Sequence, residues 1–96
     1  MTEATEGTLD ALLASPGLAL VCFYAPWAFT EREPVEAIAA DLAIPLVLVS
    51  ADRCSPQKHG VYGLPTFWLM RDGEKIAMRI GTYPAPLLKE WIVGAR

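Results

Sequence analysis

The stretch Leu18-Ala19-Leu20-Val21-Cys22-Phe23-Tyr24 decides the fold class of this chain, because seven successive residues present apolar side chains to both faces. A strand without a polar face is typical of the interior of a sheet that is covered on both sides. Ala25-Pro26-Trp27 follows it directly. The stretch therefore predicts a central strand in an α/β sandwich.

Helical patterns stand on both sides of this strand. Before it, residues 8–14 carry leucines at helical spacing and end at Ser15-Pro16-Gly17, a strong stop signal. The start of the second helix stays open, because Thr30 begins a capping box and Pro34 also suits a first helical turn. Its apolar residues recur at i, i+3, i+4 and i+7, at Val35, Ile38, Ala39 and Leu42.

The second half of the chain predicts three more strands and a closing helix. We expect a buried strand over 45–50, a one-turn helix over 55–60, a hairpin of strands 66–70 and 75–80 that turns at Asp72-Gly73, and a helix opened by Pro86. The predicted order is α-β-α-β-α-β-β-α. It describes one domain over residues 8–96, preceded by a disordered or extended N-terminus over 1–7.

Composition narrows the function classes. The 96 residues have 53% apolar content, a net charge of -3 and no basic run, which argues against nucleic acid as a partner. The longest apolar run, 18–25, is too short to span a membrane, and the polar start of the chain does not resemble a signal peptide. Two cysteines without metal-ligand spacing suit a reducing compartment. We expect a cytoplasmic protein with no metal and no cofactor.

Several motifs make the chain similar to thioredoxins. Phe23-Tyr24-Ala25-Pro26-Trp27 resembles the strand end and tryptophan that precede their redox motif, and Tyr62-Gly63-Leu64-Pro65-Thr66 resembles their cis-proline loop. Asp72-Gly73-Glu74 and Arg79-Ile80-Gly81 resemble the hairpin turn and the glycine after the last strand. The resemblance runs from about Thr8 to the end of the chain. It implies a thioredoxin-like αβα sandwich with a mixed sheet.

The polar segment before the first helix looks too short to supply the family's first strand. We therefore expect a four-stranded sheet, with that strand missing or rudimentary. Residues 45–50 would then form an open edge whose apolar side chains invite pairing with another chain.

The departures from the family concern its chemistry. Ala28 and Glu31 stand where the resemblance places the two cysteines of the Cys-x-x-Cys motif, so neither an attacking nor a resolving thiolate is present. Cys22 replaces the family's buried aspartate, and Leu48 replaces the lysine that accompanies it. The resemblance thus implies a degenerate active site and argues against an enzyme of the dithiol type.

A binding role through the family's peptide groove is the reading we favour. The resemblance predicts a cis bond between Leu64 and Pro65, which would leave the backbone of Leu64 free to pair with an extended segment of a protein or peptide partner. The charge of Glu31 would favour ligands that carry Lys or Arg. The predicted groove consists of Trp27, Ala28, Glu31, Leu64, Pro65 and Gly81.

Two other functions remain open from the sequence. Cys54 precedes a helix start and has Arg53, Lys58 and His59 nearby, which could activate an exposed thiol for monothiol chemistry with glutathione or a partner thiol. The second is a purely structural subunit that pairs, for example as a homodimer, through strand 45–50. For the remaining side chains we expect Cys22 in the core, His59 in solvent, and Trp68 and Trp91 on apolar faces.

Overall fold

The apolar stretch forms β2 (Leu18–Tyr24), the middle strand of a five-stranded sheet in the computed structural model, which describes residues 1–96. β2 pairs in parallel with β3 (Leu46–Ser50) and antiparallel with β4 (Thr66–Arg71). β5 (Glu74–Ile80) continues the sheet beyond β4, and β1 (Thr2–Glu3) lies parallel beside β3. The sheet is mixed, in the order β1-β3-β2-β4-β5.

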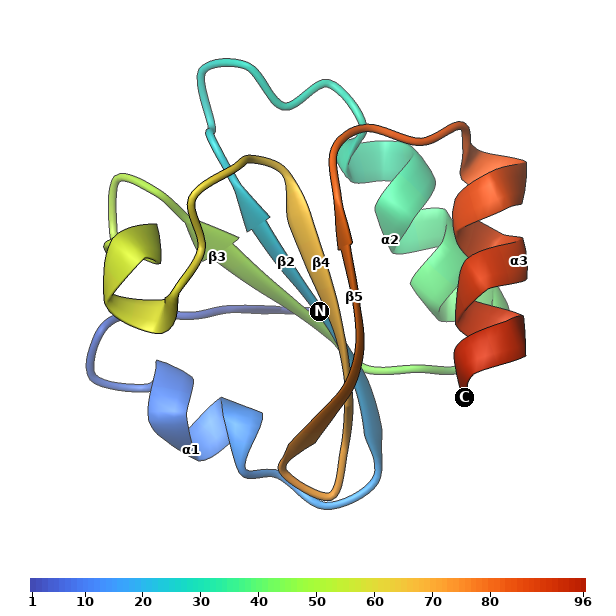
Figure 1. Ribbon diagram of the computed structural model, residues 1–96, viewed down its shortest axis with the longest axis horizontal. Coiled ribbons are helices and arrows are strands. Elements are labelled where there is room, and N and C mark those ends of the chain that lie inside the picture. Colours follow the sequence, from blue (N-terminus) through green and yellow to red (C-terminus); the bar gives the residue numbers. More distant parts are fainter.

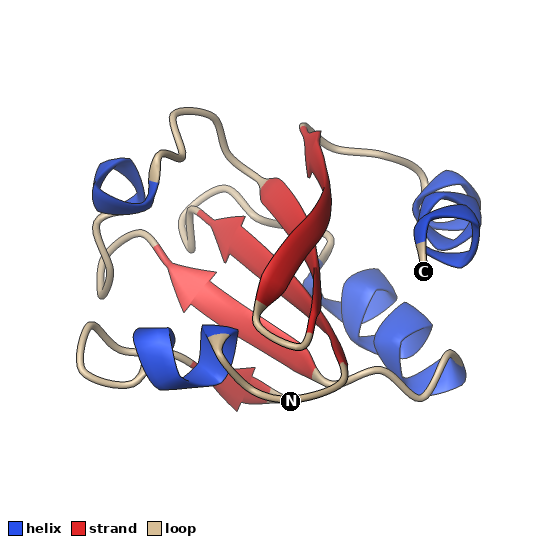
Figure 2. Ribbon diagram, turned by 60° about the horizontal axis from the view of Figure 1, so that its bottom comes forward, coloured by secondary structure: helices blue, strands red, loops and turns tan.

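Helices cover both faces of this sheet (Figures 1 and 2). α2 (Arg32–Asp41) and α3 (Ala85–Ala95) lie on one face, whereas α1 (Leu9–Leu13) and the 3₁₀ helix η1 (Pro56–His59) lie on the other. None of these helices has the length and apolar character needed to cross a lipid bilayer. The arrangement is the α/β sandwich that the sequence predicts.

Alternation along the strands divides the core into two halves. On β2, Leu20, Cys22 and Tyr24 face α2 and α3, while Val21 and Phe23 face α1 and η1. Trp68 on β4 is buried against Phe23, with ring centroids 4.6 Å apart. Cys22 and Trp68 thus lie in the core as predicted, whereas Trp91 is only half-buried.

The N-terminal strand is present as two residues, and it corrects the expectation of a four-stranded sheet. Thr2 and Glu3 pair with Val47 and Leu48, and the amide of Ala4 donates to the carbonyl of Leu48 at 2.8 Å. The prediction of an open edge at 45–50 is therefore wrong. Main-chain pairing needs no apolar pattern, so a polar segment can cover the strand. A homodimer that pairs through this strand, one of the functions that the sequence leaves open, would have to displace β1.

Side-chain contacts hold this N-terminal segment in place. Glu3 forms an ion pair with Arg32 at 3.2 Å, and the carboxylate of Glu6 accepts a hydrogen bond from the amide of Ser55 at 2.7 Å. Ala4 is 1% exposed. The segment thus links β3 to α2 on one side and to η1 on the other.

The second helix begins at Arg32, between the two starts that the sequence leaves open. Thr30 does not complete the predicted capping box with Glu33. Its amide and hydroxyl both donate to the carboxylate of the adjacent Glu31, at 3.1 Å. Glu31 stands at the N-cap of α2, but its side chain accepts from Thr30 and makes no cap hydrogen bond to the first turn of the helix.

The other edge strand, β5, is less well covered. Met78 pairs with Trp68 and Ile80 with Thr66, which places both side chains on the α1 face of the sheet. Because α1 has only five residues, it does not reach them, and they are 50% and 54% exposed. The edge position predicted for this strand is confirmed, and it leaves an apolar stripe open to solvent.

Candidate functional site

The loop after β2 meets the loop before β4 and the turn after β5 at a small pocket. Its volume is about 130 Å³. Four of the predicted groove residues lie around it: Ala28, Glu31, Leu64 and Pro65. The other lining residues are Ala25, Phe29 and Thr82. The fold thus brings together positions that are far apart in the sequence.

Two predicted groove residues lie beside this pocket and do not line it. Trp27 is 75% exposed, in keeping with a side chain available to a partner. Gly81 has a φ of 101°, and its amide donates to the carbonyl of Pro65 at 2.8 Å. Gly81 therefore fixes the turn that brings Thr82 to the pocket, because few other residues adopt this conformation. Phe29 and Thr82 carry no chemical signal in the sequence and were missed.

The backbone of the loop before β4 is open to a ligand. The Leu64–Pro65 peptide bond is cis, in agreement with the sequence-based expectation. Leu64 is 37% exposed, and neither its amide nor its carbonyl takes part in a hydrogen bond within the chain. An exposed, unpaired donor and acceptor on one residue offer an extended peptide two hydrogen bonds.

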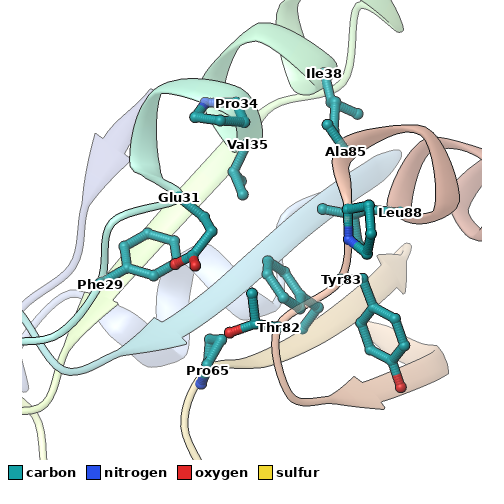
Figure 3. Close-up of a pocket in the computed structure, with 12 residues that line it drawn as sticks. Phe29, Glu31, Pro34, Val35, Ile38, Pro65, Thr82, Tyr83, Ala85 and Leu88 are labelled. Atoms are coloured by element: carbon teal, nitrogen blue, oxygen red, sulfur yellow. The ribbon is translucent and has the colours of Figure 1, made fainter.

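A larger cavity of about 350 Å³ adjoins this pocket, between α2 and α3. Figure 3 shows Val35 and Ile38 entering it from α2, with Pro65 and Thr82 at the opposite side. Phe29, Glu31, Pro65 and Thr82 line both spaces. No local sequence pattern indicates this cavity, because it assembles from side chains of α2, β4, α3 and three separate loops.

Glu31 is the acidic group at the junction of the two spaces. The three ion pairs of the chain are Arg32–Glu3, Arg32–Glu36 and Lys89–Asp41, so Glu31 has no basic partner. Burial raises the pKa of the Cys22 thiol far above its usual range. The negative charge of Glu31 raises this pKa further, so Glu31 also affects the core. Cys22 is thus held as a neutral thiol.

Cys54 differs from the exposed thiol that the sequence predicts. It is 1% exposed, and its Sγ lies 3.8 Å from the carbonyl oxygen of Ala4. Burial, followed by the charge of Glu6, raises the pKa of this thiol. These facts argue against Cys54 as a reactive nucleophile, because thiolate chemistry requires access and a lowered pKa.

His59 is also less exposed than expected. Its ring lies 6.2 Å from that of Phe23, and its buried Nε2 has no hydrogen-bond partner. Nowhere in the chain do three His, Cys, Asp or Glu side chains group in a way that could hold a metal ion.

Comparison with known proteins agrees with this geometry. Protein disulfide-isomerase A3 of Gallus gallus is 37% identical over 101 residues, which cover 97% of this chain and 19% of that protein. Thioredoxin of Rhodospirillum rubrum is 28% identical over 100 residues, 96% of each chain. No protein-family model matches.

Among solved structures, a mutant thioredoxin of Halobacterium salinarum superposes with a TM-score of 0.84 at 24% identity, over 99% of this chain and 88% of the other. The likeness shows the fold. The two sequence relatives align with almost the whole chain. The chain is a thioredoxin-family domain.

Proposed function

We propose that this domain binds an extended protein or peptide segment in the groove around Leu64 and Pro65 and carries out no disulfide chemistry there. It acts as a chaperone-like or accessory binding module. The cytoplasm suits this role, because both cysteines are unpaired.

The observation that carries the proposal is the free backbone of Leu64. Its amide and carbonyl are unpaired, and the side chain beside them is 37% exposed. A bound segment would pair with this residue as an added strand does, which gives affinity without demanding one sequence. Trp27, 75% exposed at the rim, supplies an aromatic contact of the kind that dominates many interfaces.

The residues at the pocket support binding without turnover. Ala28 has no nucleophile, and its small side chain leaves the pocket open. Glu31 cannot resolve a mixed disulfide. The two remaining cysteines are buried, so neither substitutes for the missing pair. The relatives named thioredoxin and protein disulfide-isomerase supply the domain type, and the proposal departs from them in the chemistry.

Contacts within the chain argue against the two alternative functions. Monothiol chemistry at Cys54 requires a thiol that Ala4 covers and whose pKa is raised. A structural role through strand 45–50 requires an edge that β1 occupies. Peptide binding is the candidate whose site is open.

The test starts from short peptides selected on the domain by display and then synthesised. We expect the amide resonance of Leu64 to shift strongly on titration with a selected peptide. Trp27→Ala should lower the affinity by roughly fivefold or more, the usual loss at an aromatic hot spot.

Leu87→Ala on α3 is the matched control, since Leu87 is 52% exposed and lines neither space. Its affinity should equal that of the wild type. If Trp27→Ala and Glu31→Gln both stay within about twofold of the wild type, the groove is not the working site.

A further inference from the structure

The cavity between α2 and α3 has the size of a small-molecule site. Its volume of about 350 Å³ falls at the lower end of the range of roughly 300–1,000 Å³ that ligand pockets occupy. Phe67 lies on β4. Figure 3 shows Val35 and Ile38 on α2 and Leu88 on α3. Regular elements form these walls, and the loops that carry Phe29, Glu31, Pro65 and residues 82–84 complete the lining.

The lining is apolar and aromatic. Phe29, Phe67 and Tyr83 contribute rings. The Tyr83 ring already makes a cation–π contact within the chain, because the guanidinium of Arg79 lies 4.2 Å from the centre of this ring. Aromatic faces attract organic cations and reject anions. The ring composition thus favours a ligand with a positive head and an apolar body.

Glu31 is the one ionised side chain that lines the cavity. It is half-buried and accepts hydrogen bonds only from Thr30, so carboxylate acceptor sites remain free. Its neighbour Arg32 is engaged by Glu3 and Glu36. The N-terminus of α2 would by itself attract an anion, but an anion arriving there would meet the carboxylate of Glu31.

We propose that this cavity binds a small arylalkylamine, with the ammonium group on the Glu31 carboxylate and the apolar body among Val35, Ile38, Phe67 and Leu88. An ammonium ion supplies the donors that the carboxylate lacks, in a charge-assisted hydrogen bond. This goes beyond peptide binding at Leu64.

The cavity can be tested separately from the peptide groove. Val35, Ile38, Ala85 and Leu88 line the cavity and take no part in the smaller pocket. Ala85 stands at the start of α3 and is half-buried, so a larger side chain there fills the cavity with little cost to the helix.

The experiment titrates 2-phenylethylamine into the isotope-labelled domain and follows amide shifts by NMR. Two probes with the same phenylethyl body, neutral 2-phenylethanol and anionic 3-phenylpropionate, are titrated in parallel. We expect saturable shifts at Phe29, Thr82 and Ala85 with the amine, weaker ones with the alcohol and none with the acid.

Variants then assign the contacts. Glu31→Gln should lower the amine affinity roughly tenfold, the usual contribution of a charged hydrogen-bond partner, whereas Glu33→Gln on the outer side of the same helix should leave it unchanged. Ala85→Leu should abolish amine binding and leave the affinity for the selected peptide within about twofold. Thr82→Lys, at an exposed position, places an internal ammonium near Glu31 and should block the amine even if Ala85→Leu does not fold.

Three results would overturn the proposal. They are amine shifts that do not saturate or that scatter over the surface, an alcohol that binds as tightly as the amine, and a Glu31→Gln variant with wild-type amine affinity.

Discussion

Ala28 and Glu31 lie three positions apart in the sequence and line the same small pocket, where the thioredoxin family carries its dithiol. The proposed loss of disulfide chemistry rests on these two side chains, together with Cys22 and Leu48 in place of the family's buried aspartate and lysine. The backbone around them keeps the thioredoxin fold.

The first prediction concerns catalysis. In an insulin turbidity assay with dithiothreitol, the wild-type domain should accelerate precipitation no more than a buffer blank does, because neither Ala28 nor Glu31 can attack or resolve a disulfide. Reduction at rates typical of thioredoxins would refute the loss of redox chemistry.

The double variant Ala28→Cys/Glu31→Cys is the positive control for this assay. It places one thiol at the N-cap of α2, where a helix N-terminus lowers a thiol pKa, and the other three positions earlier, in the preceding turn. We expect this variant to precipitate insulin measurably faster than the wild type.

A second residue-scale prediction concerns pH. Burial and the charge of Glu31 raise the pKa of Cys22, so the folded state holds this proton where the unfolded state releases it. The neutral thiol makes its full contribution to the free energy of unfolding below about pH 8.5, the pKa of a cysteine in the unfolded chain. This contribution declines as the pH rises further. Urea titrations measure the free energy of unfolding at about pH 7 and at about pH 10. This free energy should fall less between the two pH values in Cys22→Ala than in the wild type. Equal losses in both would mean that Cys22 does not contribute.

Single residues also mark what the sequence could and could not predict. The groove positions Ala28, Leu64 and Pro65 follow from short motifs, and the structure brings them together. The burial of Cys54 does not follow, because its cover is Ala4, fifty positions away in the chain. No local pattern around Cys54 reports a contact over that distance.

At the scale of elements, β1 is the segment that the sequence analysis undervalued. A strand of two polar residues has no apolar alternation, and what places it is a hydrogen bond to Leu48 and the burial of Ala4. The longer elements were predictable, since β2, β4 and α2 carry strong periodic patterns. Their ends were less so, as the start of α2 at Arg32 shows.

This dependence on Ala4 leads to the third prediction. Ala4→Leu overfills a site that is 1% exposed, and we expect a cost of roughly 1–3 kcal/mol in the free energy of unfolding. The strain should also loosen β1 and speed the labelling of Cys54 by a thiol reagent under native conditions.

Ala11→Leu on the exposed side of α1 is the control and should change neither quantity. If Ala4→Leu leaves the labelling rate of Cys54 unaltered, β1 is not what shields that thiol.

On the scale of the whole molecule, two layers of helices enclose a five-stranded sheet, and the site forms where loops from both halves of the chain converge (Figure 1). The order of helical and strand patterns along the sequence predicted this layered architecture. The cavity beside the groove did not, since its volume depends on how far α2 stands from α3, and the sequence does not specify that spacing.

The fourth prediction follows from the net charge of -3 together with the unpaired carboxylate of Glu31 in the groove. A selected peptide with Lys or Arg should bind more tightly than its variant with Glu at the same position, and the difference should shrink as salt rises. Glu31→Gln should reduce this preference, whereas Glu33→Gln should not. Calorimetry at low and high salt measures the two peptide affinities. If the preference for the basic peptide does not change with salt, its origin is not electrostatic.

The uncovered strand β5 affects how the protein behaves at high concentration. Its stripe of Ile76, Met78 and Ile80 faces water on an edge strand, the combination that promotes sheet-to-sheet aggregation. Lys75 and Arg79 lie on the same strand and act as gatekeepers, because a second copy of β5 that paired there would bring like charges together. These two basic residues therefore oppose aggregation through this edge of the sheet.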